Sequence, residues 1–175
     1  QPTIELAERW SKQRLAAMID DTPELRRLIA PARSRDSGNT TLLKEWPGGV
    51  LIISGANSSA SLRSMPARYL FADEVDAYPV DLDGEGDPLS LAEARTSTFA
   101  AGRKLFICST PTIKSLSVID KEYQLSDRRR YYIPCPHCGH EQPLDWEHLH
   151  WHPGDPHSAA YVCASCGSLI PEHCK

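Results

Sequence analysis

The chain has 175 residues, of which 41% are hydrophobic and 24% are charged, so it can bury a core of ordinary size and is neither disordered nor fibrous. Its formal net charge of −4 gives no overall basic field, so any contact with nucleic acid must come from local patches or from parts outside this chain. The sequence contains no apolar run of about 18 residues and no charged-then-apolar leader, so we expect a soluble intracellular protein.

The first third of the chain alternates between helical and strand patterns. Residues 3–20 have the apolar face of an amphipathic helix, and residues 23–29 predict a second, shorter helix after a Thr-Pro break. Residues 40–54 predict a β-hairpin with its turn at Pro47-Gly48-Gly49. A short helical stretch that ends near Arg63 follows.

A short apolar run, residues 69–72, ends at two adjacent carboxylates, Asp73 and Glu74. Buried strands of a parallel sheet are nearly continuous hydrophobic runs, and ligands bind beyond their carboxyl ends. The first carboxylate could hold Mg²⁺ and the second could polarise an attacking water. The pair therefore predicts phosphoryl-transfer chemistry, although an ordinary turn at the end of a strand would give the same pattern.

The next buried strand, residues 105–108, follows a helix predicted over residues 89–100. The order strand, helix, strand implies a right-handed parallel crossover, so both strands should end on the same edge of the sheet. Ser109 and Thr110, with Pro111, then lie close to the acidic pair. Their hydroxyl groups are well placed to sense a γ-phosphate or the water bound to it.

A phosphate-binding loop of the form GxxxxGK[ST] does not occur in these 175 residues. The nearest candidate, residues 55–61, has neither a second Gly in the required place nor a Lys. Without backbone amides and a lysine to hold the β- and γ-phosphates, Asp73 and Glu74 face an incomplete site. We therefore expect the chain by itself to bind ATP poorly and to be inactive.

The cysteines have the most specific spacing in the chain. Two CxxC pairs, Cys135 with Cys138 and Cys163 with Cys166, are separated by 24 residues, and a glycine follows each pair. The two-residue spacer lets both thiolates of one knuckle bind the same metal, and the glycine permits the positive φ of the tight turn. Two knuckles complete a closed Cys₄ site, which predicts a structural zinc. Disulfides or free thiols are the alternative interpretation.

Residues 126–175 predict a separate small module that is joined through a polar segment. Its sequence from Tyr131 onward has no helical period, and the span between the cysteine pairs is long enough for an extended hairpin that carries Trp146 and Trp151. His137, His140 and His173 could substitute as metal ligands, but four cysteines suffice. Arg128-Arg129-Arg130, next to two tyrosines, could contact a DNA backbone, or could simply be an exposed linker.

The order of these motifs resembles that of the large terminase subunits of tailed double-stranded DNA phages, in the group whose ATPase is followed by a cysteine-rich module. The resemblance covers nearly the whole chain and is carried by four further segments: Gln1–Thr3, Asp36–Thr41, Gly48-Gly49 and Cys135–Gln142. It implies an α/β fold with a partial RecA-like parallel sheet and flanking helices. Residues 1–125 would be a partial P-loop-type ATPase core without its Walker A motif, and residues 126–175 a zinc-ribbon-like module.

The resemblance also implies roles for single residues. In that family the Asp-Glu strand is the Walker B motif, so Asp73 would coordinate the magnesium of Mg-ATP and Glu74 would be the catalytic carboxylate. Ser109 and Thr110 look like the coupling motif that links hydrolysis to movement along DNA. The Walker A segment would precede Gln1 and a metal-dependent nuclease would follow the last residue, so we expect an interior piece of a longer polypeptide.

Proteins of this family package double-stranded DNA into a preformed capsid. The resemblance therefore implies the small terminase subunit and the portal protein as partners, a homo-oligomer on the capsid, no membrane, and the cytoplasm of the bacterial host. Two other classes remain open. Asp73-Glu-Val-Asp76 and Ser109-Thr-Pro also fit superfamily-2 helicases, for which strand unwinding without capsid or portal would be evidence. A non-enzymatic zinc-ribbon interaction module would bind DNA or protein without any ATPase activity.

Overall fold

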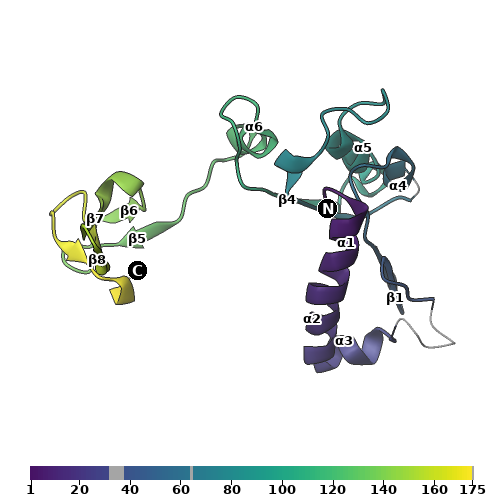
Figure 1. The fold of residues 1–175 in the computed structure, drawn as a ribbon, viewed down its shortest axis with the longest axis horizontal. Coiled ribbons are helices and arrows are strands. Elements are labelled where there is room, and N and C mark those ends of the chain that lie inside the picture. Colours follow the sequence, from purple (N-terminus) through teal and green to yellow (C-terminus); the bar gives the residue numbers. More distant parts are fainter. Residues whose placement is uncertain (32–37, 64, 175) are drawn as a thin grey trace. The chain divides into compact units, whose positions relative to one another are not determined.

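The structure is a computed structural model that describes residues 1–31, 38–63 and 65–174. The chain divides into two compact units, Gln1–Tyr123 and Gln124–Lys175, each with its own core (Figure 1). Asp36 and Ser37, which belong to one segment of the family resemblance, lie outside the described residues. None of the helices in these ranges is long and apolar enough to cross a membrane.

One long helical segment opens the first unit. It consists of α1 (Ile4–Trp10), the π-helical η1 (Ser11–Leu15) and α2 (Ala16–Asp21), which follow one another directly and confirm the predicted helix. Thr3 caps it, because its hydroxyl oxygen accepts the N–H of Leu6 at 3.3 Å. The shorter helix α3 (Pro23–Leu28) is confirmed too, with proline in the first turn, where no N–H is needed.

The predicted hairpin packs on this helical segment. Strands β1 (Leu43–Trp46) and β2 (Gly49–Ile52) pair antiparallel, and the turn residue Gly48 has a φ of 92°, which a side chain rarely permits. Ser11 is 2% exposed and donates its hydroxyl to the carbonyl of Thr41 at 2.5 Å, which ties the helix to the hairpin. The first hydrophobic cluster lies between them and contains Ala7, Leu15, Ile19 and Ile53.

Gly55 lies where the chain leaves the hairpin and passes the start of α1. A Cβ at this position would come within 2.5 Å of the nitrogen of Ile4 and 2.7 Å of the carbonyl carbon of Thr3, both backbone atoms. We therefore expect Gly55→Ala to lower the free energy of unfolding by about 1–3 kcal/mol, measured by thermal or urea unfolding. Gly102→Ala is the control, because its nearest atom, at 3.0 Å, belongs to the flexible side chain of Arg68. Equal losses in the two variants would contradict this explanation.

The two strands with polar ends are parallel neighbours. Strand β3 (Tyr69–Asp73) pairs with β4 (Lys104–Cys108) so that Asp73 lies opposite Cys108, which confirms that both strands end on the same edge. The connection contains α5 (Pro88–Ala94), whose N-cap Asp87 accepts the N–H of Ser90 at 2.8 Å. Hydrogen-bonded pairing in register thus places residues from distant parts of the sequence side by side.

The prediction of a helix over residues 89–100 is wrong at its C-terminal end. Helix α5 stops at Ala94, and a short 3₁₀ turn, η3 (Ser97–Phe99), follows it. Thr96 is fully buried and donates its hydroxyl to the carbonyl of Glu93 at 2.8 Å. Such local side-chain bonds compete with the backbone ladder and favour the end of a helix. The predicted helical stretch before the acidic strand is present as α4 (Ser59–Arg63).

Helix α6 (Val118–Leu125) was not predicted. The first residues of α6 pack in the second hydrophobic cluster of the unit, beside the acidic strand. Its buried members are Ala72, Val75 and Leu89, and Tyr78, Ile107, Val118 and Ile119 pack against them. The 3₁₀ turn η2 (Val75–Ala77) contributes one of these residues, so the chain just after the acidic pair and the beginning of α6 share one core.

The second unit is built from short antiparallel strands. Strand β5 (Tyr132–Pro134) pairs with β6 (Glu141–Pro143), and a three-stranded sheet has the order β7 (Leu149–His152), β8 (Asp155–Val162), β9 (Leu169–Ile170). Strands β7 and β8 form the hairpin predicted between the cysteine pairs, but it carries only Trp151, because Trp146 precedes it. Two short 3₁₀ turns, η4 (Trp146–His148) and η5 (Glu172–Cys174), complete the unit. Its core consists of Cys135, Tyr161, Cys163 and Ile170.

Trp146 in η4 and Trp151 in β7 are in contact with each other. Their ring centroids are 6.1 Å apart and their planes are inclined by 61°, an edge-to-face arrangement. The hydroxyl of Tyr161 donates to the carbonyl of Pro143 at 2.9 Å and accepts the N–H of Asp145 at 3.0 Å. These bonds attach the chain that leads into the hairpin to Tyr161, a residue of the core.

Candidate functional site

Asp73 ends β3 and is the meeting point of three segments. One carboxylate oxygen accepts the side-chain amide of Gln1 at 3.0 Å, and the other accepts the thiol of Cys108 at 3.2 Å. Burial raises the pKa of the Cys108 thiol, and the hydrogen bond to Asp73 and the charge of that carboxylate raise it further, so the thiol keeps its proton and acts as a donor. The structure thus brings Gln1 and Cys108 to the predicted magnesium ligand, and no local sequence pattern indicated either contact.

Glu74 has an unusual backbone conformation. Its φ of 56° and ψ of 49° lie in the left-handed region, which costs a non-glycine residue free energy. Its side chain is exposed next to Asp73, and its carbonyl accepts the N–H of Ala77 at 3.0 Å at the start of η2. Backbone strain of this kind is concentrated at functional sites. The second residue of the acidic pair is therefore held open to solvent by a conformation that the surrounding core enforces.

A cavity of about 510 Å³ in the first unit reaches Asp73 but not Glu74. Gln1, Asp73, Tyr78 and Cys108 are among the polar residues of its wall, and most of the remaining wall is apolar, including Phe71. Burial raises the pKa of Tyr78 to about 12; a hydrogen bond with the backbone of Asp73 lowers it, and electrostatic repulsion from Asp73 and Cys108 raises it slightly. A mostly apolar cavity with a few convergent polar groups is the usual form of a ligand site.

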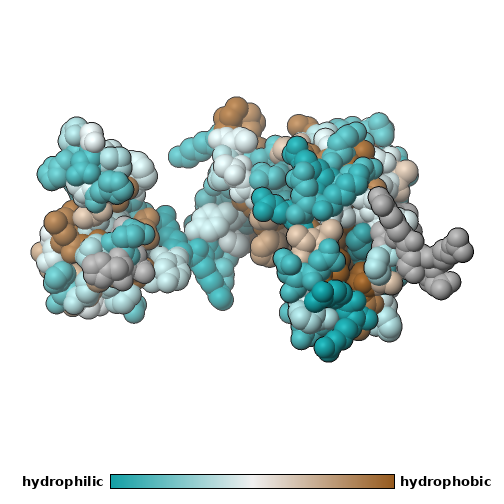
Figure 2. Space-filling model, turned by 60° about the horizontal axis from the view of Figure 1, so that its bottom comes forward, coloured by the Kyte–Doolittle hydropathy of each residue, from teal (hydrophilic) through white to brown (hydrophobic). Residues whose placement is uncertain are grey.

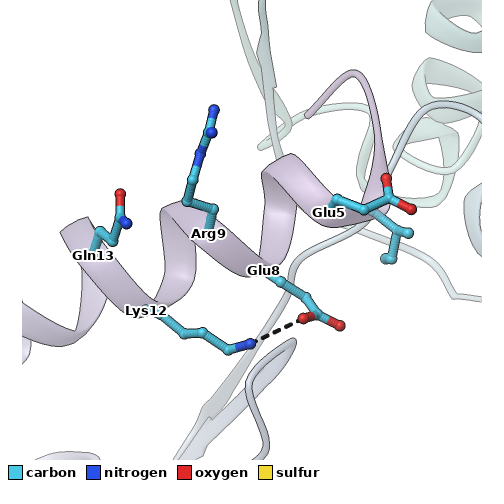
Figure 3. A pocket seen from close by; sticks show the side chains of 6 residues that line it. Glu5, Glu8, Arg9, Lys12 and Gln13 are labelled. Atoms are coloured by element: carbon cyan, nitrogen blue, oxygen red, sulfur yellow. Dashed lines mark hydrogen bonds and ion pairs between the residues drawn. The ribbon is translucent and has the colours of Figure 1, made fainter.

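A second depression, of about 320 Å³, lies along the polar face of α1 and η1 (Figure 3). Its wall consists of Ile4, Glu5, Glu8, Arg9, Lys12 and Gln13. Lys12 and Glu8 form an exposed i,i+4 ion pair at 3.0 Å, which contributes only about 0.2–0.5 kcal/mol. None of the predicted site residues lines this depression, so we interpret it as an ordinary solvated helix face.

Ser109 lies directly after β4 and reaches the chain that follows the acidic pair. Its hydroxyl oxygen accepts the backbone N–H of Asp76 at 3.1 Å, and its side chain is half-buried. Thr110, the next residue, is exposed. The parallel pairing of the two strands therefore places Ser109 within hydrogen-bond distance of residues 74–77, called the acidic loop below, while Thr110 stays open to solvent.

Asp76 was not singled out as a site residue, yet it makes the densest set of contacts near the pair. Its carboxylate accepts the N–H and the hydroxyl of Thr112, both at 2.9 Å, and the N–H of Ile119 at 2.9 Å. Partial burial opposes ionisation, but these bonds and one from the Ser117 hydroxyl outweigh it and lower the pKa of Asp76 to about 2. The carboxylate is therefore ionised throughout the neutral range.

The second unit gathers Cys135, Cys138, Cys163 and Cys166 into one group, called the cysteine cluster below. All four sulfur atoms lie within 4.8 Å of one another. The Sγ atoms of Cys135 and Cys166, and those of Cys138 and Cys163, are 3.8 Å apart. Four thiolates at the usual distance of about 2.3 Å from a tetrahedral zinc would be about 3.8 Å apart. The spacing therefore fits a tetrahedral metal site.

The two knuckles have the same backbone geometry. The N–H of Gly139 donates to the carbonyl of Cys135 at 2.9 Å, and the N–H of Gly167 donates to that of Cys163 at 2.9 Å. The two glycines have φ values of 73° and 72°. This confirms the role predicted for the glycines, because only a residue without Cβ enters this conformation freely.

Backbone donors favour the thiolate form of Cys163 in the second knuckle. The backbone N–H of Cys166, together with that of Ser165, lowers the pKa of Cys163 to about 6. Gln142 is 2% exposed and lies between the knuckles, where its side-chain oxygen accepts the N–H of Ala164 at 2.8 Å. Donors near a sulfur favour the thiolate, which is the form that binds metal.

The basic run at the start of the second unit is partly paired with acidic side chains. Arg129 contacts Asp127 at 2.6 Å, and Arg130 contacts Asp145 at 3.5 Å. All four side chains are largely exposed, so these ion pairs are weak and leave the arginines accessible. The geometry is compatible with phosphate contacts and equally with a solvated linker.

Comparison with known proteins places this arrangement in a family. The family model described as the phage terminase large subunit gpA, ATPase domain, matches residues 1–175. The chain belongs to this terminase family. The terminase large subunit of Enterobacteria phage P21 is 30% identical over 178 residues, which are 97% of this chain and 28% of that protein. The terminase large subunit of Escherichia phage lambda is 28% identical over 177 residues, with the same coverage of both chains. No solved structure matches.

The terminase chain therefore spans less than a third of the length of these relatives. The family match decides among the three classes left open by the sequence, and it favours the terminase over a helicase or a free-standing interaction module. The structure confirms a mixed α/β unit with a parallel strand pair, flanking helices and a separate cysteine cluster.

Proposed function

We propose that this chain is part of the ATP-hydrolysing motor with which a phage terminase moves double-stranded DNA into a capsid. One observation carries the proposal: two adjacent carboxylates, Asp73 and Glu74, lie at the end of β3, which is parallel to β4, in a chain whose whole length matches a terminase ATPase domain. Asp73 is the proposed magnesium ligand, Glu74 the catalytic carboxylate, and Ser109 and Thr110 the coupling motif.

The residues present suit these roles. Mg²⁺ prefers carboxylate oxygens, and both present partners of the Asp73 carboxylate are neutral donors, which a divalent cation can replace. When bound with ATP, Mg²⁺ neutralises charge on the β- and γ-phosphates. Glu74, exposed beside Asp73, orients the attacking water and accepts its proton. Ser109 sits on the neighbouring strand end, one hydrogen bond from the acidic loop.

The parallel pair β3–β4 is proposed to be part of a larger RecA-like sheet. Phe71 and Phe106, 70% and 60% exposed, lie side by side on the two strands with ring centroids 6.3 Å apart. Hydrophobic residues also interrupt the polar surface of both units in Figure 2. Exposed apolar surface of this kind usually marks a site of contact with another part of the protein or with a partner. A chain that spans 28% of its relatives leaves ample sequence for further strands and for a phosphate-binding loop.

The experiment compares ATP hydrolysis by residues 1–175 with that of the longer terminase polypeptide that contains a GK[ST] loop. The longer protein should hydrolyse ATP and be stimulated by double-stranded DNA, whereas residues 1–175 alone should bind ATP poorly. A longer protein without ATPase activity, with or without DNA, would refute the proposed function.

The cysteine cluster is proposed to hold one structural zinc, which makes residues 126–175 a zinc-ribbon-like module. Four cysteine ligands leave no open position, so the metal stabilises the fold and does not act on substrate. The proposed partners are double-stranded DNA, the small terminase subunit and the portal protein, with several copies assembled on the capsid in the cytoplasm of the bacterial host. Together with residues 1–125, the partial ATPase core, the module would form the central part of the motor.

Gln142 provides a test of how the knuckles are braced. We expect Gln142→Leu to weaken zinc binding about 10-fold or more, because the N–H of Ala164 loses its acceptor and the second knuckle loses its support. Competition with a chromophoric chelator measures the affinity. Gln124→Leu is the matched control outside the cysteine cluster, and an equal loss there would contradict the role of Gln142.

A further inference from the structure

Asp76 connects the acidic loop to a distant stretch of the chain through both its backbone and its side chain. Its N–H donates to Ser109, and its carboxylate accepts three bonds of 2.9 Å from Thr112 and Ile119. The partners of the carboxylate are 36 and 43 residues further along the chain. One side chain therefore holds both the segment after β4 and the beginning of α6.

The same residue lies in the turn that fixes Glu74. Glu74 is the N-cap of η2, and its carbonyl accepts the N–H of Ala77 at 3.0 Å. Val75, between Glu74 and Asp76, is 1% exposed, so the turn is anchored in the core. Any displacement of Glu74 must move this anchored turn, and Asp76 moves with it.

The bonds to Asp76 are of the strong kind. The donors that contact its carboxylate are backbone N–H groups and hydroxyls, all neutral, and the carboxylate is ionised. Hydrogen bonds to an ionised group are about twice as strong as bonds between neutral groups. A helix cap elsewhere in the chain, such as Asp87 at α5, bonds only within four residues of itself, whereas Asp76 links separate segments.

We propose that Asp76 is a positioning residue of the hydrolytic site: it keeps Glu74 in fixed register with Ser109 and with the start of α6, so that movement at either place is passed to the other. This inference rests on the proposed function. The link therefore runs from the acidic pair to the beginning of α6, the helix with which the first unit ends and the second begins. Asp76 itself would not contact the nucleotide.

The test uses the full-length terminase with Asp76→Ala, Asp76→Asn and Thr112→Val. We expect kcat for ATP to fall about 10- to 100-fold while KM changes less than about 3-fold, because Glu74 is misplaced whereas ATP binding is not weakened. The backbone amides of Thr112 and Ile119 should exchange with solvent at least about 10-fold faster, as measured by hydrogen–deuterium exchange without nucleotide. Thr112→Ser keeps the hydroxyl and should behave like the parent protein.

Asp87→Ala is the matched control, since it removes a carboxylate that caps α5 and does not touch the acidic loop. It should lower stability like Asp76→Ala and leave kcat and the exchange at Thr112 unchanged. Unchanged kcat in the Asp76 variants, in a protein that Glu74→Gln inactivates, would overturn the inference alone. Full turnover with Glu74→Gln would instead refute the catalytic role proposed for Glu74, and unchanged exchange at Thr112 and Ile119 would still overturn the link through Asp76.

Discussion

Glu74→Gln in the full-length terminase is expected to lower ATP turnover by about 10²–10⁴-fold, the usual contribution of a general base. The amide has nearly the shape of the carboxylate but cannot accept the proton of the attacking water. The left-handed backbone at this position and the anchored turn η2 do not depend on the charge, so the fold should persist. Steady-state hydrolysis measures the loss, and equilibrium binding of a fluorescent ATP analogue should stay within about 3-fold of the parent protein.

Glu93→Gln is the control for this experiment. Glu93 lies on α5, its side chain is 46% exposed, and its only ion pair is to Arg103 at 3.6 Å among the described residues. Its amide variant should hydrolyse ATP at the parental rate. Parental turnover with Glu74→Gln would remove Glu74 from the catalytic role, and a simultaneous loss of nucleotide binding would point to a structural effect of the substitution.

Loss of the proposed zinc is expected to unfold the second unit. Its core contains two of the four proposed ligands, Cys135 and Cys163, each 2% exposed, so the cysteine cluster and the hydrophobic core are one structure. Small modules of this kind gain most of their folding free energy from the metal. Treatment with a strong chelator, or Cys163→Ser, should abolish cooperative unfolding of this unit, as followed by near-ultraviolet circular dichroism, while the helical signal of the first unit persists.

Cys174→Ser is the control, because Cys174 packs against the same core but lies outside the cysteine cluster. It should retain one zinc per chain by metal analysis and unfold cooperatively. If the parent protein contained no metal and unfolded cooperatively all the same, the cluster would be a set of free thiols, and the proposed structural zinc would be wrong.

The sequence predicted those features that depend on neighbouring residues. The spacing of each CxxC pair with its glycine gave both knuckles, because a tight turn is determined by a few consecutive residues. The apolar runs before Asp73 and Ser109 gave two strands, and the intervening helix predicted their parallel pairing. These interpretations needed no knowledge of distant contacts.

The rest depends on contacts that no local pattern records. Asp76 bonds to residues 36 and 43 positions away, and Gln1 reaches Asp73 across 72 positions. The early end of α5 follows from the burial of Thr96, which depends on packing and not on propensity. The larger sheet and the phosphate-binding loop stay predictions, because these 175 residues contain one parallel strand pair among the described residues and no GK[ST] motif.

The edge-to-face pair of Trp146 and Trp151 gives the second unit its own optical signal. Two indoles whose centroids are 6.1 Å apart couple their electronic transitions, and this coupling vanishes once the rings separate. The other two tryptophans of the chain, Trp10 and Trp46, belong to the first unit. Circular dichroism near the indole bands can therefore follow assembly and loss of the second unit without any attached label, even in a much longer polypeptide.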